Sequence, residues 1–310
     1  MLIVLNKKSG AGRASLLWDR SGTDILQIAG LDKEKYRIME DEMEFENRIH
    51  EAVNEKEDFI VAAGGDGTVN RLVTVLMKMK KKVRERVTLG AIGLGSSNDF
   101  HKPFAKSKSF RGIPFLLDRG RSRMSNIIRI KTSIQFREGK IRYSIINSSL
   151  GVIAEGNRLF NENSGMTFRM KRLGTTPAIF TAAVISLLKT KPFKSKLTIQ
   201  GSEREITVTN LSVILSPHFT GNLVYDTPID RYQDHFIVNL AEGRSFVNRM
   251  VGFADLSLGR FAGRKGCHSL TSTHLKIIPE RDVALEYDGE VEMVSQAEFD
   301  LVRGGIRLCG

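Results

Sequence analysis

The sequence predicts an α/β protein with an N-terminal doubly wound parallel-sheet domain and a C-terminal β-rich, sandwich-like domain. Strand and helix patterns alternate over residues 1–122, as in a parallel sheet with crossover helices. After Arg123 the segments become short, alternating and β-rich, with few helices between them. The chain has 310 residues, of which 41% are hydrophobic, so two domains can each bury a core. We therefore expect domains at residues 1–122 and 123–310, with a C-terminal tail able to pack back on the first.

The elements of the first domain follow one another at regular intervals. Short apolar runs indicate strands, and apolar residues spaced three or four apart indicate helices. The expected strands are Leu2–Leu5, Tyr36–Met39, Phe59–Ala63 and Val87–Ile92, and the expected helices are Arg13–Ile28, Phe45–Val53 and Val69–Met79. Turns follow three of these strands, near Ser9–Gly12, Gly64–Gly67 and Gly93–Gly95. In a doubly wound sheet such turns gather at the carboxyl edge of the strands, where ligands bind.

The second domain is predicted from a series of short β-rich segments. Helices are expected mainly between Gly151 and Leu188. The expected strands are Ile127–Phe136, Ile141–Ile146, Lys196–Ile199, Glu205–Val208, Leu211–Leu215, Phe236–Leu240, His274–Ile278 and Val283–Tyr287. This pattern favours a sandwich or a half-open barrel.

Charge and cysteine content narrow the class of partner and compartment. The formal net charge is +12, which favours an anionic partner such as a nucleic acid, an anionic membrane or a phosphorylated substrate. The two cysteines, Cys267 and Cys309, form neither a disulfide framework nor a zinc-binding spacing, which favours a reducing compartment such as the cytoplasm. No run of about 18 apolar residues indicates a transmembrane helix.

A glycine-rich turn after the third strand carries the strongest chemical signal. The buried run Phe59–Ala63 is followed by Gly64–Thr68 and then by a helical pattern. Glycines let the backbone approach an anion closely, and the first amides of a helix donate hydrogen bonds to it. Asp66 adds a carboxylate, which beside phosphates serves to hold a metal ion or to accept a proton. Glycine-rich turns alone are common, but this combination favours a phosphate site.

These residues resemble a known family. Gly64-Gly65-Asp66-Gly67-Thr68 is similar to the signature of the diacylglycerol kinase catalytic-domain family, which includes bacterial lipid kinases and is related to sphingosine and ceramide kinases. Further similar elements occur in the family's order: Leu5–Arg13, Gly93–Phe100, Asn147–Gly151 and Tyr287–Glu290. The resemblance implies an ATP- and Mg²⁺-dependent lipid kinase that phosphorylates a hydroxyl of diacylglycerol or a related lipid.

The resemblance also implies the nucleotide-binding residues. Arg13 follows two glycines at a helix start, where its cation could reach the phosphates. Ser96 stands where the family has threonine, and Ser96 and Ser97 are suited to cap a helix that starts at Asn98. The implied nucleotide-binding set is Asn6, Ser9, Gly10, Gly12, Arg13, Gly64, Gly65, Asp66, Gly67, Thr68, Asn70, Gly95, Ser96 and Asn98.

The candidate catalytic residues are acids. A lipid hydroxyl must lose its proton as it attacks the γ-phosphoryl group, and a positioned carboxylate can accept that proton. Asp288 and Glu290 lie on a turn centred on Gly289, in the element to which the family's general base is assigned. Glu290 is the first choice for the base and Asp66 the second, with Asp66 alternatively holding Mg²⁺.

A structural Mg²⁺ site is implied by a weaker match. Residues 230–236 resemble the family's Asp-Asp-Gly-Leu-Leu-Asp-Val element. Asp234 aligns with the metal-binding carboxylate, and Arg231 and Phe236 would supply backbone carbonyls. His235 replaces a glycine and Val238 replaces an acid, so the match is incomplete.

Two alternative functions remain open. NAD kinases share Gly-Gly-Asp-Gly-Thr, but they add an Asn-Glu pair and a Thr-Gly-Ser-Thr-Ala-Tyr-like stretch, and this sequence has neither. A catalytically degenerate member would bind nucleotide or lipid without turnover. Lys7 in place of a proline and Asn126 in place of an aspartate, together with Val238, motivate that alternative. No nucleic-acid-binding motif occurs, so no such partner is expected.

The segment Pro177–Leu188 is apolar and is flanked by basic residues. It is too short to span a bilayer. It is either a buried helix that covers the β-rich domain or a membrane-facing element, because its flanks Lys171, Arg172, Lys189 and Lys191 suit anionic headgroups. We expect a cytoplasmic protein that meets its lipid substrate at an anionic membrane surface, peripherally associated with it. The sequence leaves a homodimer open.

Overall fold

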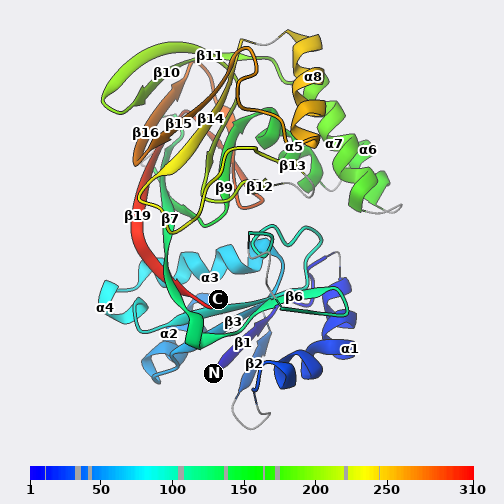
Figure 1. Ribbon diagram of the computed structural model, residues 1–310, viewed down its shortest axis with the longest axis vertical. Helices are drawn as coiled ribbons and strands as arrows, with labels where there is room; N and C mark the ends of the chain where they lie inside the picture. Colours follow the sequence, from blue (N-terminus) through cyan, green and yellow to red (C-terminus); the bar gives the residue numbers. More distant parts are fainter. Residues whose placement is uncertain are drawn as a thin grey trace. The chain divides into compact units, whose positions relative to one another are not determined.

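The computed structural model describes residues 1–10, 12–31, 36–40, 44–103, 108–135, 139–162, 165–171, 175–219, 223–243 and 245–310 (Figure 1). Phe136, at the end of one expected strand, and the flanking residue Arg172 lie outside this described part. The chain divides into two compact units, Met1–Ile127 with Arg303–Gly310 and Ile128–Val302. The predicted fold class is confirmed: a parallel sheet is followed by a β-rich region.

The first unit is built on a parallel sheet with the order β2-β1-β3-β4. Its strands are β1 (Leu2–Leu5), β2 (Arg37–Glu40), β3 (Phe59–Gly64) and β4 (Thr88–Gly93). β1, β3 and β4 are buried along their whole length, as expected for central parallel strands that read as apolar runs. The strand order reverses at β1, so the carboxyl ends of β1 and β3 mark the topological switch point.

Helices connect these strands. They are α1 (Arg13–Ile28), α2 (Phe45–Asn54), α3 (Asp66–Lys78) and the short α4 (Lys81–Arg84). α3 buries Val69, Leu72, Val73 and Leu76, which is the spacing that predicts a helix. It begins at Asp66, earlier than the expected start at Val69, because an acidic residue is favourable in the first turn of a helix.

The edge of the sheet at β4 is covered by segments from two distant parts of the chain. β6 (Ile113–Leu116) pairs antiparallel with Ala91 and Ile92, and β5 (Lys108–Phe110) pairs with β6. The end of β19 (Gln296–Leu308) pairs parallel with Thr88 and Leu89 through its last two residues. The C-terminal end of the chain is therefore a strand of the first unit.

The second unit is almost entirely antiparallel. Its strands include the second part of β7 (Arg123–Ser133), β8 (Ile141–Ser144), β9 (Asn147–Gly151), β10 (Phe193–Ile199), β11 (Ser202–Ile214), β14 (Phe236–Glu242), β15 (Cys267–Ser272), β16 (His274–Pro279), β17 (Val283–Tyr287), β18 (Glu290–Val294) and most of β19, with the short pair β12 (His218–Phe219) and β13 (Leu223–Val224). β11 pairs with β10 through its first half and with β9 through its second half. We expected two strands here, but β11 is one strand with a register shift between Val208 and Asn210.

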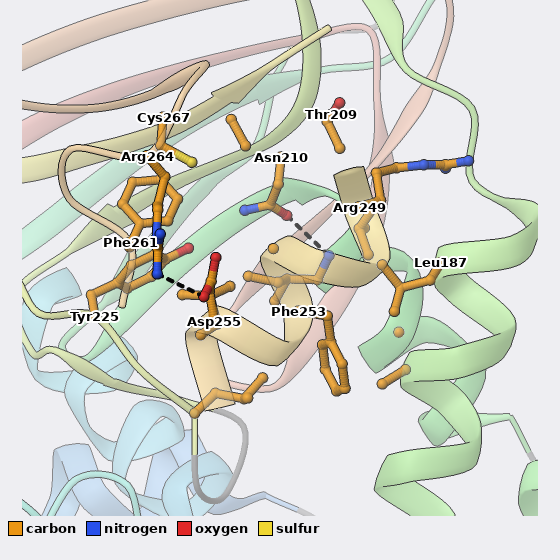
Figure 2. Close-up of a pocket in the computed structure, with 18 of the residues that line it drawn as sticks. Leu187, Thr209, Asn210, Tyr225, Arg249, Phe253, Asp255, Phe261, Arg264 and Cys267 are labelled. Carbon is orange, nitrogen blue, oxygen red and sulfur yellow. Dashed lines mark hydrogen bonds and ion pairs between the residues drawn. The ribbon is translucent and has the colours of Figure 1, made fainter. Parts of the chain in front are cut away.

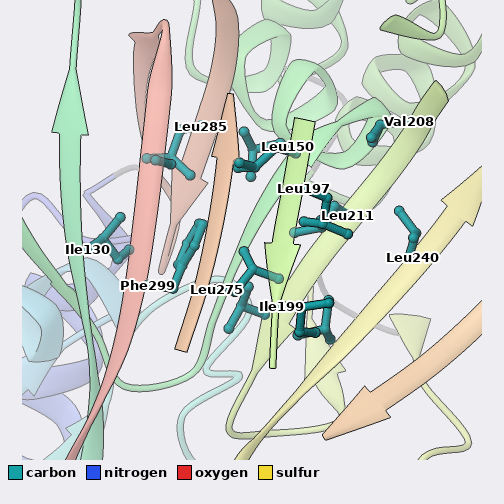
Figure 3. Close-up of a cluster of buried hydrophobic side chains, with 14 of the residues drawn as sticks. Ile130, Leu150, Leu197, Ile199, Val208, Leu211, Leu240, Leu275, Leu285 and Phe299 are labelled. Atoms are coloured by element: carbon teal, nitrogen blue, oxygen red, sulfur yellow. The ribbon is translucent and has the colours of Figure 1, made fainter. Parts of the chain in front are cut away.

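One apolar core holds these strands together. Figure 3 shows side chains from β7, β9, β10, β11, β14, β16, β17 and β19 pointing into it. Leu150, Leu211, Leu275 and Phe299 are all fully buried there. The long strand β11, which pairs with both β10 and β9, contributes Leu211 to this core and Ile214 to a second, smaller apolar cluster in the same unit.

In the described part of the second unit the helices are α5 (Val152–Asn161), α6 (Gly165–Lys171), α7 (Thr175–Lys189) and α8 (Phe246–Ser257). We expected helices of this domain mainly between Gly151 and Leu188, so α8 was not predicted. α8 begins after Ser245, whose hydroxyl accepts a hydrogen bond from the amide of Asn248 (3.4 Å), an N-cap. None of the helices in the described ranges is long and apolar enough to cross a membrane.

Candidate functional site

Three turns meet at the switch point of the first unit. The amide of Asn6, directly after β1, donates to the carbonyl of Ala63 on β3 (2.9 Å). The side chain of Asn6 then donates to Thr68 Oγ1 on α3 (3.0 Å). Gly65 donates its amide to Ser9 Oγ (2.8 Å), and Leu94 donates its amide to the carbonyl of Gly64 (2.8 Å). Three elements that the sequence placed on separate turns therefore form one hydrogen-bonded junction.

Glycine is required at this junction because the backbones approach too closely for a side chain. A Cβ atom added at Gly95 would lie 2.5 Å from the Cα atom of Gly65. A Cβ atom added at Gly64 would lie 2.3 Å from Thr68 Oγ1. Both distances are shorter than real Cβ contacts, so the turns could not pack in this way with larger residues.

We therefore expect Gly95→Ala to destabilise the first unit by about 1–3 kcal/mol. The clash is with backbone, which cannot rotate away as a side chain can. Chemical denaturation measures this loss of stability. The control is Gly156→Ala on α5, where the nearest atom to an added Cβ is 3.8 Å away, so that loss of a helical glycine should stabilise the protein. A Gly95→Ala protein as stable as the wild type would contradict the steric argument.

Asp66 connects two of the three turns. Its Oδ1 accepts the amide of Phe100 (2.9 Å), and its Oδ2 accepts the amide of Asp99 (3.1 Å). The carboxylate is half-buried at the first position of α3. A negative charge there is stabilised by the helix dipole as well as by the two amides. Asp66 thus holds the 95–100 turn in place, a role that the sequence did not indicate.

The 95–100 turn differs from the expectation of a helix starting at Asn98. Residues 99–103 form turns, and Asn98 before them has a left-handed φ of 51°. Its Oδ1 accepts the amide of Gly95 (3.0 Å), and its Nδ2 donates to the carbonyls of Gly93 and Gly95 (both 3.2 Å). A short amide side chain that satisfies the backbone in this way favours a turn over a helix. Ser96 is exposed at the tip of the turn.

Two helices begin at the junction, and neither has a side-chain cap. At the start of α3 the amides of Thr68 and Val69 donate to the carbonyl of Gly65. At the start of α1 the amides of residues 12–14 donate to the carbonyls of residues 8–10, and Gly12 has a φ of 88°. Because helix starts without a side-chain cap favour negative charge, both are candidate anion sites.

The remaining members of the expected nucleotide-binding set fall into two groups. Arg13 is exposed on the first turn of α1, and Gly67 is exposed on the first turn of α3. Thr68 and Asn70 are buried on α3. Gly10 has a φ of 59° and packs against the carbonyl of Leu94. Arg13 and Gly67 therefore face solvent at the junction, whereas Thr68 and Asn70 contribute to the core beneath it.

Asp288, one of the two acids expected on the late turn, is buried in the second unit. Its Oδ1 accepts hydrogen bonds from Ser144 Oγ (2.7 Å) and from the amides of Ile146 (3.0 Å) and Asn147 (3.1 Å). Its Oδ2 accepts the amide of Ile145 (2.8 Å). This carboxylate therefore holds the turn between β8 and β9.

We expect Asp288→Asn to lower the free energy of unfolding by about 2–4 kcal/mol, because the new amide group would oppose backbone donors in a buried site. Thermal and chemical denaturation measure the loss. Asp282→Asn, in the loop before β17, is the control and should change stability little. If Asp288→Asn were as stable as Asp282→Asn, the Asp288 carboxylate would not be the group that orders the turn between β8 and β9.

Glu290, the first choice for the general base, lies two residues further on. It is exposed and opens β18, opposite Tyr287. The turn before it is held from three sides. Asp288 binds residues 144–147, Glu286 Oε1 accepts the amide of Gly289 (2.7 Å), and Asn161 of α5 donates to the carbonyl of Gly289 (2.9 Å). Glu290 therefore projects into solvent from a well-ordered turn.

Glu286 was not anticipated from the sequence as a site residue. It is buried on β17, and its second carboxylate oxygen accepts a hydrogen bond from Ser149 Oγ (2.8 Å). The sequence feature that could have identified Glu286 is a charged residue within the otherwise apolar expected strand Val283–Tyr287. Burial raises the pKa of the neighbouring Tyr287 to about 12, and the nearby carboxylates of Glu292 and Glu290 add to this rise. Tyr287 is therefore a neutral hydrogen-bonding group beside Glu290.

The residues expected to hold a structural metal occupy different environments. The Asp234 carboxylate is 81% exposed and pairs with His235 Nδ1 (2.9 Å). Phe236 is buried at the start of β14. Arg231 is fully buried, and burial lowers the pKa of its guanidinium to about 10, although the nearby Tyr232 and Asp288 oppose this shift. Asn126, which stands where the family has an aspartate, accepts a hydrogen bond from the amide of Gly304 through its Oδ1 (3.0 Å).

A pocket in the second unit was also not anticipated. It lies between helices α5, α7 and α8 and the strands β11 and β14, and it encloses about 880 Å³ of space, its open mouth included. Figure 2 shows Phe253, Phe261 and Leu187 around it, with Asp255 paired to Arg264 (3.0 Å) at one side. Tyr225 hydrogen-bonds Ser212 (3.0 Å), and burial raises its pKa. The lining is mostly apolar, which suits a hydrocarbon ligand.

Comparisons with known proteins agree with the motifs. Residues 1–130 match the family model "Diacylglycerol kinase catalytic domain". The chain is 30% identical over 107 residues to the mitochondrial acylglycerol kinase of Homo sapiens, a match that covers 34% of this chain and 25% of that protein. It is 34% identical over 105 residues to a "Probable lipid kinase YegS-like" protein of Pectobacterium atrosepticum, covering 32% of this chain and 31% of that protein.

A solved structure extends the comparison to both units. The diacylglycerol kinase of Bacillus anthracis shares this fold with a TM-score of 0.66 at 14% sequence identity, covering 99% of this chain and 95% of that chain. At this identity the likeness shows the fold alone. The sequence matches to the curated relatives span only about a quarter to a third of those proteins. The predicted resemblance to diacylglycerol kinase catalytic domains is thus confirmed over residues 1–130, and the curated relatives that match the chain carry the names of lipid kinases.

Proposed function

We propose that the protein is an ATP- and Mg²⁺-dependent lipid kinase that transfers the γ-phosphoryl group to a hydroxyl of diacylglycerol or a related lipid. The observation that carries this proposal is the junction of the Gly64–Thr68 turn with the 6–12 and 93–98 turns at the switch point. It combines close-packed glycines, an uncapped helix start and a carboxylate, which together suit a polyphosphate with a metal ion.

On the nucleotide side, we propose that the exposed residues at the junction contact ATP. Gly67 and Ser96 present backbone amides and a hydroxyl at the rim, and Arg13 offers a cation from α1. Asn6, Ser9 and Asn98 act indirectly, because their side chains are bound to other parts of the junction. Their role in this proposal is to keep the three turns in register.

The donor chemistry at Asp66 fits Mg²⁺, which prefers carboxylate oxygens and phosphate oxygens as ligands. Mg²⁺ supplies neutralisation of charge on the transferred phosphoryl group. Asp66 would hold it while also binding the amides of Asp99 and Phe100. The second, structural site fits less well, because Asp234 is exposed and paired with His235.

On the acceptor side, the second unit offers an apolar pocket and an ordered acid. The pocket suits the hydrocarbon part of a lipid. Glu290 would accept the proton of the lipid hydroxyl, on a turn held by Glu286, Asp288 and Asn161. Asn161 ends α5, which also lines the pocket, so one helix connects the pocket wall to the turn that carries the base.

One experiment tests the proposed lipid kinase activity against the two alternatives, an NAD kinase-like activity and a catalytically degenerate protein. Purified protein is incubated with radiolabelled ATP and Mg²⁺ against a panel of diacylglycerol, monoacylglycerol, ceramide and sphingosine, with NAD included. We expect label in one or more lipids and none in NAD. Label in NAD alone would favour the soluble-kinase alternative, and ATP binding without transfer would favour the degenerate one. A phospholipid-synthesis role in the cytoplasm, at a membrane surface, is part of the same proposal.

A further inference from the structure

α8 carries large apolar side chains on the protein surface. None of its residues is buried, although seven of the twelve are apolar. Val247 is 66% exposed, and Phe246, Met250 and Val251 on the same helix are also exposed. Leu258, directly after the helix, is 65% exposed. An amphipathic helix normally buries its apolar stripe, so this helix leaves apolar surface to be covered by a partner.

The neighbouring helices extend this surface. On α7, Phe180 is 61% exposed and Leu188 is exposed beside Lys189, and on α6 Met166 is exposed. α8 lies next to the end of α7, where the Arg249 guanidinium donates to the carbonyl of Thr190, and Figure 1 shows α6, α7 and α8 grouped together. We call the following residues the apolar helix face: Met166, Phe180, Leu188, Phe246, Val247, Met250, Val251 and Leu258. Single exposed apolar residues are ordinary, but a group on adjacent helices marks an interaction surface.

The charges around the apolar helix face have one sign. Residues 165–171 and 175–196 contain six Lys or Arg residues (Arg169, Lys171, Lys189, Lys191, Lys194 and Lys196) and no Asp or Glu. Residues 245–265 contain Arg249, Arg260, Arg264 and Lys265, and their single acid, Asp255, is paired with Arg264. Glu155 of the adjacent α5 and Glu162, directly after that helix, both pair with Arg158. The partner of this face is therefore anionic.

We infer that the apolar helix face docks on the surface of an anionic phospholipid bilayer, with its apolar side chains in the interface and Lys189 and Lys191 at the headgroups. A second copy of the chain fits less well, because self-association would bring two basic rims together. The inference rests on the proposed function in one respect, since it names the surface from which a lipid substrate would reach the pocket. α8 has the matching two sides: Phe253 and Leu256 line the pocket, while Val247 and Val251 face outward.

The first test removes apolar contacts without touching the pocket or the nucleotide junction. Flotation is measured with vesicles of phosphatidylglycerol and phosphatidylcholine, and with phosphatidylcholine alone, in the absence of ATP and Mg²⁺. We expect binding to the anionic vesicles only, weakening as salt rises. Val247→Gln with Val251→Gln should reduce the binding by about tenfold or more. The matched control is Leu16→Gln with Ile28→Gln, two exposed apolar residues of α1 in the first unit, which should bind like the wild type.

The second test reverses charge. Lys189→Glu with Lys191→Glu should weaken binding to anionic vesicles by about tenfold or more, because each cation near such a surface contributes roughly fivefold at most and reversal adds repulsion. Lys80→Glu with Lys82→Glu, exposed basic residues at the start of α4 in the first unit, is the control and should have a much smaller effect. Far-ultraviolet circular dichroism confirms that each variant is folded.

Several outcomes would overturn the inference. These are equal binding to neutral and anionic vesicles, no binding to either, or full binding by both test variants. A dimer in analytical ultracentrifugation that dissociates in Val247→Gln with Val251→Gln, without vesicle binding, would assign the face to a second copy. Kinase activity on a short-chain, water-soluble diacylglycerol is measured in parallel, so failure of the docking surface is distinguished from failure of the proposed kinase activity.

Discussion

Asp66→Asn is expected to leave the protein folded and to reduce lipid phosphorylation by about 10²-fold or more, the usual effect of removing one preorganised electrostatic group. The carboxylate accepts the amides of Asp99 and Phe100 and lies at the first position of α3. An asparagine keeps the shape, but it loses the charge and turns one acceptor into a donor that faces a backbone N–H. The same change should also raise the KM for ATP, because the 95–100 turn loses its attachment.

The measurement is steady-state kinetics with ATP varied at a fixed lipid concentration, alongside thermal denaturation. The matched control is Asp19→Asn, an exposed aspartate of α1, which should retain wild-type kinetics. A normal kcat in Asp66→Asn would rule out a role for this carboxylate in the reaction. A normal kcat with a raised KM would leave it only the role of holding the turn.

Glu290→Gln is expected to abolish phosphorylation while leaving the affinity for ATP nearly unchanged. The base acts on the acceptor hydroxyl, so its loss removes an interaction of the transition state and not one of nucleotide binding. The structure places Glu290 exposed at the start of β18, on a turn held by Glu286, Asp288 and Asn161. Because the side chain is exposed, the substitution should not change stability.

This prediction is checked by transfer of label from ATP to diacylglycerol and by calorimetric titration with ATP. Glu203→Gln, an exposed glutamate near the start of β11, serves as the control and should retain activity. If Glu290→Gln phosphorylated lipid at the wild-type rate, Glu290 would not be the base, and Asp66 would become the first candidate. A loss of ATP affinity equal to the loss of activity would instead point to a role in the nucleotide site.

Local patterns predicted the four parallel strands of the first unit and its helices α1, α2 and α3, but they missed α4, β5 and β6 and indicated a helix from Asn98 where the chain forms a turn. Apolar runs such as Phe59–Ala63, followed by helical spacing from Val69, are read from adjacent residues, and they predicted the strands and helices of the sheet in the correct order. Gly64–Thr68 identified a turn with a close backbone approach, because a Cβ atom added at Gly95 would lie 2.5 Å from the Cα atom of Gly65. In the second unit the same approach was weaker. It divided β11 at its bulge and missed α8, whose apolar residues have no buried face to give them a clear period.

The sequence by itself determined the fold class, the four parallel strands in their order along the chain and the three turns that carry the family's motifs, because each depends on neighbouring residues and on residue type. The tertiary structure alone decided what those residues do. Asp66 binds the amides of residues 99 and 100, Asp288 binds the turn at 144–147, and helices α5, α7 and α8 enclose a pocket. These contacts join segments far apart in the chain, and no local pattern encodes which distant backbone group a carboxylate meets when the chain folds.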